Sequence, residues 1–213
     1  MGSPIVEPVI TEVQVPPGML GPDPMTFEVR SFVVVGAGGV VLVDAGTPGS
    51  GEAIGSTLAA LGATWTDVTD IVLTHSHFDH TGGLAESAEL ASQADVWAGA
   101  EDVSEISPVG GRAARSLAQG DRFGDLSVFH TPGHTPGHVS LLHEALSLLI
   151  IGDLIGSDEG APSLGPAAFT ADPDRSLRSL RQMLDLKPDR ILFSHGAEIP
   201  EPISAIREFL DAS

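Results

Sequence analysis

The segment Thr74–Gly83, THSHFDHTGG, holds three of the chain's eight histidines and one aspartate within six positions. It follows a short apolar run that predicts a strand, and two glycines end it. Residues two apart in extended backbone project to the same side, so His75 and His77 can direct both imidazoles at one point. Asp79 and His80 lie beyond the turn and can face a second point nearby. Because imidazole nitrogens and carboxylate oxygens bind metals, this spacing indicates a pair of metal ions.

Four ligands do not complete two metal sites, so we expect further ligands at the ends of other strands, where functional residues of α/β sheets gather. His134 lies between two glycine-containing turns in the stretch HTPGHTPGH. Asp153 directly follows one apolar strand, and His195 directly follows another. His138 is close to these residues in sequence and is a candidate for a position behind the ligands.

Composition narrows the range of functions. The chain has no cysteine, which excludes disulfides, thiolate nucleophiles and sulfur ligands. Its 10 basic and 29 acidic residues give a formal net charge of -19, which argues against nucleic acid as a partner and raises the hypothesis of a high-salt habitat. No apolar run is long enough to cross a membrane and the first residues do not resemble a secretion signal, so we expect no membrane partner and a cytoplasmic location.

Hydrophobic periodicity predicts the elements that must hold the candidate ligands. Predicted strands cover residues 9–15, 27–35, 40–44, 70–73, 95–98, 126–131, 139–142, 147–152 and 190–193, and predicted helices cover 52–61, 83–93, 101–106, 172–186 and 201–210. Strands come first as meanders and then alternate with helices, which favours a layered α/β fold. A length of 213 residues without a linker is typical of one domain, 1–213, and either a monomer or a homodimer is compatible with it.

The motif T-H-x-H-x-D-H, followed by a distant His, Asp and His, resembles the metallo-β-lactamase superfamily. The resemblance runs from LVDAG around Asp44 to SHG around His195. It implies an α/β fold of four layers, an αββα sandwich with two mixed β-sheets flanked by helices, and a dinuclear site at one edge. It also implies a ligand set, with Asp44 supporting the metal loop from behind: His75, His77 and His134 on the first metal, Asp79, His80 and His195 on the second, and Asp153 bridging.

The resemblance is strongest to short glyoxalase II-like hydrolases, because lactamases proper usually lack the bridging aspartate. We therefore expect two divalent ions, zinc first and iron or manganese next, and a metal-bridging hydroxide that attacks a thioester, ester or lactone carbonyl. Asp79 would orient the water and pass on its proton. The alternatives are a mononuclear-iron persulfide dioxygenase, β-lactamase or phosphodiesterase activity on the same fold, and a non-catalytic metal-binding module.

Two segments are candidates for recognising a small-molecule substrate. Pro16–Met25 is rich in proline and glycine, and Gly156–Thr170 directly follows the candidate bridging aspartate. Long loops in compact domains are usually functional, so we predict that both are structureless and contact substrate. Their apolar, lysine-free character favours a neutral or hydrophobic substrate. The candidate substrate-binding residues are Met19, Leu20, Met25, Leu164 and Phe169.

Overall fold

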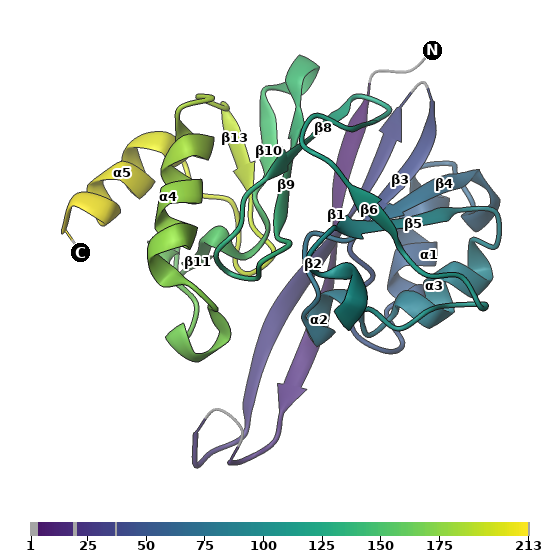
Figure 1. Ribbon diagram of the computed structural model, residues 1–213, viewed down its shortest axis with the longest axis horizontal. Helices are drawn as coiled ribbons and strands as arrows, with labels where there is room; N and C mark the ends of the chain where they lie inside the picture. The colour runs from purple at the N-terminus through teal and green to yellow at the C-terminus, as the bar shows by residue number, and fades with distance from the viewer. Residues whose placement is uncertain (1–3, 19–20, 37, 213) are drawn as a thin grey trace.

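A computed structural model describes residues 4–18, 21–36 and 38–212 of the chain. Two β-sheets lie face to face between two layers of helices, and Figure 1 shows the N-terminal half of the chain on one side and the C-terminal half on the other. Both large sheets mix parallel and antiparallel pairs. The predicted α/β fold of four layers is confirmed. Within the described residues, no helix combines the length and the apolar character needed to cross a membrane.

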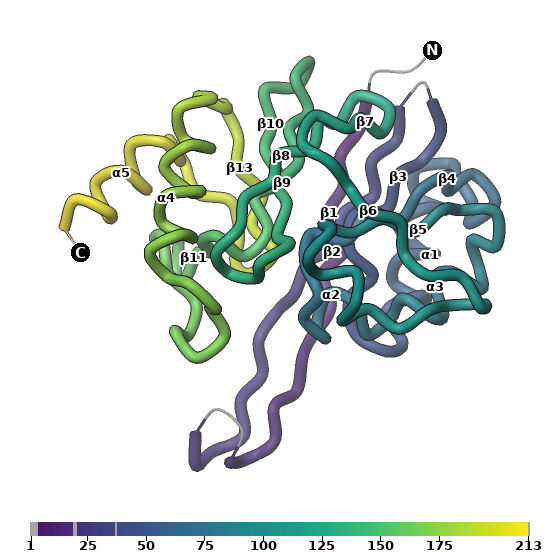
Figure 2. Tube along the Cα trace, in the orientation of Figure 1, coloured from purple at the N-terminus to yellow at the C-terminus, as the bar shows by residue number. Residues whose placement is uncertain are grey.

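The first sheet, which we call the N-terminal sheet, has six strands in sequence order. The first three pair antiparallel, and the next connections are parallel because helical crossovers join them. Its first two strands form a long hairpin that continues beyond the body of the molecule, as the trace in Figure 2 shows. The strands are β1 (Ile5–Val15), β2 (Met25–Gly36), β3 (Gly39–Val43), β4 (Val68–Val72), β5 (Asp95–Gly99) and β6 (Arg115–Leu117).

The second sheet, the C-terminal sheet, has five strands in the order β13, β10, β9, β8, β7. Only β13 and β10 pair in parallel. A separate two-stranded sheet, β11 and β12, follows β10 in the chain. The bounds are β7 (Arg122–Phe123), β8 (Leu126–His130), β9 (Val139–His143), β10 (Leu148–Ile150), β11 (Gly156–Asp158), β12 (Ala161–Ser163) and β13 (Arg190–Leu192).

Helices cover the outer face of each sheet. The N-terminal sheet carries α1 (Gly51–Ala60) and α3 (Leu84–Leu90), and the C-terminal sheet carries α4 (Pro173–Leu184) and α5 (Pro202–Ala212). The side chain of Asp172 accepts the Arg175 N–H and caps α4, as its sequence predicts. A one-turn helix, α2 (Phe78–Thr81), and five 3-10 turns complete the described elements: η1 (Trp65–Asp67), η2 (Val103–Glu105), η3 (Glu144–Leu146), η4 (Gly152–Leu154) and η5 (Ala167–Phe169).

Three hydrophobic cores separate the four layers. Residues on opposite faces of one strand enter different cores, as β10 illustrates: Leu148 and Ile150 face the N-terminal sheet, whereas Leu149 packs against the C-terminal helices. A strand buried on both faces reads as a continuous apolar run, which is why the sequence around β10 is uniformly aliphatic. The helix α4 supplies Leu180 and Met183 to the outer core.

Several predicted elements differ from the structure. The segment 156–170 is not structureless, because it contains β11, β12 and η5. The helix predicted at 83–93 ends at Leu90. A strand that the sequence analysis did not predict, β6, begins at Arg115, which pairs with Asp95 on the neighbouring strand.

Candidate metal centre

The ends of four strands meet at one edge of the sandwich. The loop after β4 leads into α2, and His77 stands at the N-terminal cap position of that helix. His134 lies in the loop between β8 and β9, Asp153 lies in η4 after β10, and His195 follows β13. The N-terminal sheet therefore supplies the THSHFDH segment, and the C-terminal sheet supplies the three distant candidates. The structure brings all seven predicted ligands together.

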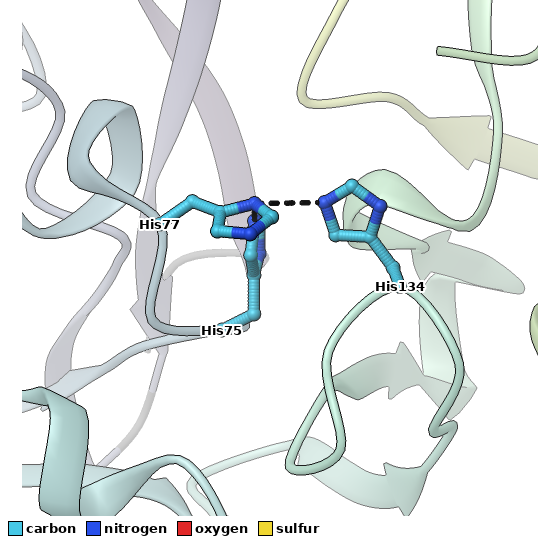
Figure 3. A group of neighbouring side chains, drawn as sticks. All are labelled: His75, His77 and His134. Carbon is cyan, nitrogen blue, oxygen red and sulfur yellow. Dashed lines mark hydrogen bonds between the residues drawn. The ribbon is translucent and has the colours of Figure 1, made fainter. Parts of the chain in front are cut away.

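Three ring nitrogens converge in what we call the three-histidine group (His75, His77 and His134). His77 Nδ1 lies 3.1 Å from His75 Nε2 and 3.0 Å from His134 Nε2. Figure 3 shows the three rings facing one another, with a dashed line from His77 to His134. Three nitrogens converging at this separation form one face of a metal coordination shell.

A second cluster, which we call the mixed group (Asp79, His80 and His195), lies beside the first. Asp79 Oδ2 is 3.3 Å from His195 Nε2 and 3.7 Å from His80 Nε2. Asp153 stands between the two groups. Its Oδ2 lies 3.5 Å from His134 Nε2 and 3.2 Å from His195 Nε2.

The site has buried polar atoms that the protein itself does not satisfy. His80 Nε2 and Asp153 Oδ1 are buried without a hydrogen-bond partner, although they lie 3.5 Å apart. Such atoms are costly in a folded protein unless something else binds them. Both belong to groups whose ligand atoms lie within 4.8 Å of one another. The nitrogen and oxygen donor set and these unsatisfied atoms fit divalent metal ions.

Asp44 supports the THSHFDH segment from behind. Its carboxylate accepts the Thr74 backbone N–H at 2.7 Å and the Thr74 hydroxyl at 2.8 Å, and it lies 2.9 Å from His80 Nδ1. Asp44 is fully buried at the end of β3 and has a positive φ of 60°. A carboxylate on the far nitrogen of a ligand imidazole fixes the ring and raises its basicity. Asp44 lies in this position relative to the His80 ring.

His138 also lies behind the candidate ligands. Its Nε2 accepts the Asp153 backbone N–H at 3.0 Å, which places the ring proton on Nδ1, 2.9 Å from Thr131 Oγ1. Gly152 makes room for this contact, because a Cβ there would meet His138 Nε2 at 2.4 Å. His138 therefore positions Asp153 rather than joining the ligand groups.

Burial keeps the three-histidine side neutral. It lowers the pKa of His134 to about 4 and holds the pKa of His75 well below its usual range. Burial also lowers the pKa of His77. Neutral imidazoles offer the lone pairs that a metal needs without first releasing a proton.

The carboxylates have the opposite effect on the mixed group. Burial lowers the pKa of His195, but Asp153 and Asp79 outweigh it and raise the pKa to about 10. Asp153 and Asp44 likewise hold the pKa of His80 well above its usual range despite burial. Burial raises the pKa of Asp153, yet His80 and His195 keep it well below normal. In and around the mixed group, the carboxylates therefore stabilise positive charge.

Asp102 is a supporting residue that sequence reasoning missed. It is buried and accepts the Ser76 N–H at 3.0 Å, the Gly137 N–H at 2.7 Å and the Thr135 hydroxyl at 2.6 Å. It thus ties the loop of His75 and His77 to the loop of His134. The sequence gives no local sign of this, because its partners lie 26 to 35 positions away.

The predicted substrate residues lie at different distances from the site. The ring centroid of Phe169 is 6.4 Å from that of His77, and Leu164 lines a cavity together with Asp153. Met25 is exposed and lines a different cavity at the end of the β1–β2 hairpin. Met19 and Leu20 lie outside the described residues. Sequence reasoning missed Phe27, whose ring centroid is 5.4 Å from that of His195.

Comparison with known proteins identifies the family. The model of the metallo-beta-lactamase superfamily matches residues 26–195. The chain belongs to the metallo-β-lactamase superfamily. The predicted superfamily is confirmed, and with it the prediction of an enzyme, since relatives carry the names of hydrolases. Members of this superfamily bind divalent metals, and the clustered histidines and aspartates are suited to that role.

Two relatives and one solved structure illustrate the likeness to other metallo-β-lactamase superfamily members. YobT of Bacillus subtilis (strain 168), named as an uncharacterized protein, is 27% identical over an alignment of 213 positions. The alignment covers 87% of this chain and 90% of YobT. A hydroxyacylglutathione hydrolase of Jannaschia sp. (strain CCS1) is 39% identical over 99 residues, which cover 45% of this chain and 37% of that enzyme. The structure of TTHA1623 in a di-iron-bound form has a TM-score of 0.68 and 27% identity, and covers 90% of this chain and 97% of that one.

Proposed function

We propose that this chain is a dinuclear metal-dependent hydrolase that cleaves a thioester, ester or lactone. The observation that carries the proposal is the position of Asp153. Its Oδ2 lies within 3.5 Å of a nitrogen in the three-histidine group and within 3.2 Å of a nitrogen in the mixed group. One carboxylate can therefore serve both groups, which is the arrangement that two neighbouring cations require.

The candidate ligands divide into two groups, one for each ion. The three-histidine group would hold one ion, the mixed group the other, and Asp153 would contact both. When bound, a pair of divalent ions lowers the pKa of a shared water and polarises a carbonyl oxygen. Imidazole and carboxylate ligands suit zinc first and iron or manganese next. The di-iron-bound form named for TTHA1623 supports keeping iron as a candidate.

The chain's own side chains orient the water and carry its proton. Asp79 is the more accessible carboxylate, with 20% of its side chain exposed against 11% for Asp153. Burial raises the pKa of Asp79, but the hydrogen bond to His195 and the charge of His80 lower it, so it is ionised at neutral pH. An ionised carboxylate with part of its side chain exposed can accept a proton from water at its other oxygen, Oδ1, and release it to bulk solvent.

Contacts behind the rings keep the mixed group in place while Asp79 acts. His195 Nδ1 donates to the Glu28 carbonyl oxygen at 2.8 Å, and His80 Nδ1 faces Asp44 at 2.9 Å. Both rings are therefore anchored to the N-terminal sheet, and their Nε2 atoms stay directed at the centre. Fixed rings reduce the reorganisation needed when charge develops on the substrate.

Thioesters are the first substrate class to test. A hydroxyacylglutathione hydrolase is among the matched relatives, but the chain spans only 37% of that enzyme, so its specificity does not carry over with the likeness. Esters and lactones present the same carbonyl to the same groups. A neutral small molecule of this kind fits a chain whose net charge of -19 repels polyanions.

The test combines metal analysis with a substrate panel. We expect purified protein to hold about two ions per chain and to hydrolyse thioesters, esters or lactones, with His77→Ala as the inactive control. One iron per chain with oxygen uptake on a persulfide would identify a dioxygenase instead. Turnover of β-lactams or phosphodiesters alone would assign another substrate class. Bound metal without turnover of any substrate would leave a non-catalytic module.

A further inference from the structure

A small cavity of about 90 Å³ opens beside Asp153. Its walls come from the 3-10 turn η4, from the segment 164–170 that contains η5, and from the start of α4. Most of the side chains that line it are aliphatic. They include Leu154, Leu164, Ala167 and Leu177.

This cavity adjoins the candidate metal centre. Asp153 belongs to both, and Thr170, which also lines the cavity, lies 3.2 Å from His134 Nδ1 through its hydroxyl. Phe169 adjoins Thr170 in sequence, and its half-exposed ring lies near His77. A carbonyl group held beside Asp153 can therefore place an apolar substituent in this cavity, away from water.

The electrostatics of the cavity disfavour an anionic substituent. Asp153 is the only ionisable side chain that lines it, and neither lysine nor arginine does so within the part of the chain that the structure describes. A carboxylate carried into the cavity would lose its water and find no lysine or arginine among the described residues that line it.

We propose that this cavity is the acyl pocket, and that the substrate carries a short, neutral, aliphatic acyl group. The inference rests on the proposed hydrolase function and adds the substrate class. Binding of methylene groups in an apolar pocket changes kcat/KM by roughly tenfold or more per group, and the gain stops when the chain outgrows the space. The acyl group thus sets specificity, whereas the other half of the substrate remains outside this pocket.

A matched substrate series tests the pocket. Acetyl, butyryl, hexanoyl and succinyl thioesters of one short neutral thiol would be compared with the metal-loaded protein. We expect kcat/KM to rise by roughly a hundredfold or more from acetyl to butyryl, which differ by two methylene groups. The succinyl group has the same number of carbon atoms as butyryl but ends in a carboxylate. We expect kcat/KM for the succinyl thioester to be roughly a hundredfold lower than for the butyryl thioester. Equal kcat/KM for all four, or a preference for succinyl, would overturn the proposal.

Two substitutions locate the effect. Leu164→Asp places a charge at the wall and Ala167→Leu fills space, and both positions are exposed enough to tolerate change. Each should lower kcat/KM for butyryl by about tenfold and for acetyl by less, with metal content unchanged. Leu90→Asp is the control, because Leu90 is 43% exposed and Leu164 is 44% exposed. A loss that is the same for every acyl chain would contradict the assignment.

Binding separates this inference from the proposed function. Ketone analogues, in which a methylene replaces the thioester sulfur, cannot be hydrolysed, and their affinities can be measured by calorimetry for the butyryl and succinyl forms. Selective butyryl binding that Leu164→Asp abolishes, without turnover of any ester, thioester or lactone, would sustain the pocket and refute the hydrolase. Turnover without selectivity would refute the pocket alone.

Discussion

Asp153 lies between the two candidate ligand groups and contacts both. Its carboxylate lies within 4 Å of ring nitrogens from both sheets, and its backbone N–H donates to His138. The loop that carries it is fixed, since Gly152 has a positive φ of 63° and packs against that histidine. A side chain held this firmly can bind two cations at the same time without rearranging.

Replacing Asp153 with alanine should remove metal and turnover together. The ions contribute several kcal/mol to the transition state, so kcat/KM should fall by roughly a thousandfold or more. Elemental analysis and substrate kinetics on the same sample measure both effects. Asp158→Ala is the matched control, because Asp158 is an exposed carboxylate in β11 and should retain metal and rate. Normal activity in Asp153→Ala would contradict a shared carboxylate.

Residue type and spacing were sufficient to predict which side chains meet. The seven candidates carry a local signal, because each directly follows an apolar run, lies in the THSHFDH segment or, as His134 does, lies between two glycine-containing turns. Residues that contact the site from far along the sequence carry no such local signal. Thr170 reaches His134 across 36 positions, and Asp102 reaches Gly137 across 35, and neither lies in a recognisable motif.

At the scale of elements, Asp102 joins the two loops that present the three-histidine group. It follows β5, and its oxygens accept donors from the loop after β4 and from the loop between β8 and β9. Gly137 is required for this approach, because a Cβ there would meet Asp102 at 2.5 Å. Asp102 therefore links the two loops directly.

Asp102→Asn should weaken the three-histidine group selectively. The amide nitrogen cannot accept a hydrogen bond, so at least one loop loses its tie, and metal affinity at this group should fall by roughly 10- to 100-fold. Stepwise cobalt titration followed by absorption separates the two groups. Glu101→Gln is the control, since the neighbouring Glu101 side chain is 53% exposed. Equal weakening of both groups would show that Asp102 only stabilises the fold.

Strands with continuous or alternating apolar residues were predicted from the sequence, whereas short strands in polar sequence were not. The strands β2, β3, β8 and β10 have continuous or alternating apolar residues, and each was predicted. The short strands β11 and β12 lie in polar, glycine-containing sequence and form because they pair with each other beside the segment after β13. Arg115 joins a strand because its guanidinium packs over Trp97, 5.2 Å from the ring centroid, which no local pattern indicates.

At the scale of the molecule, the candidate centre joins the two halves of the sandwich. The THSHFDH segment belongs to the N-terminal sheet, and His134, Asp153 and His195 belong to the C-terminal sheet. Whatever binds all of them links both sheets at one edge. The stability of the chain should therefore depend on that ligand.

Chelation should lower the melting temperature by roughly 10 °C. A ligand present at a thousand times its Kd adds about 4 kcal/mol, and each kcal/mol shifts Tm by about 2–4 °C in a chain of this size. Differential scanning calorimetry before chelation, after it, and after metal is returned measures the shift. The Asp153→Ala protein serves as control and should melt at one temperature throughout. If chelation leaves the Tm of the wild-type protein unchanged, metal does not link the sheets.

The outer strand β1 has its own consequence. It spans 11 residues at the end of the N-terminal sheet, and among the described residues no further strand pairs with it. Long open edges commonly recruit strands from other molecules and so promote aggregation. Pro8 interrupts the row of N–H donors, and the exposed Glu7 and Glu12 add negative charge along it. Pro8 and these charges therefore disfavour self-association by strand addition at the open edge of β1.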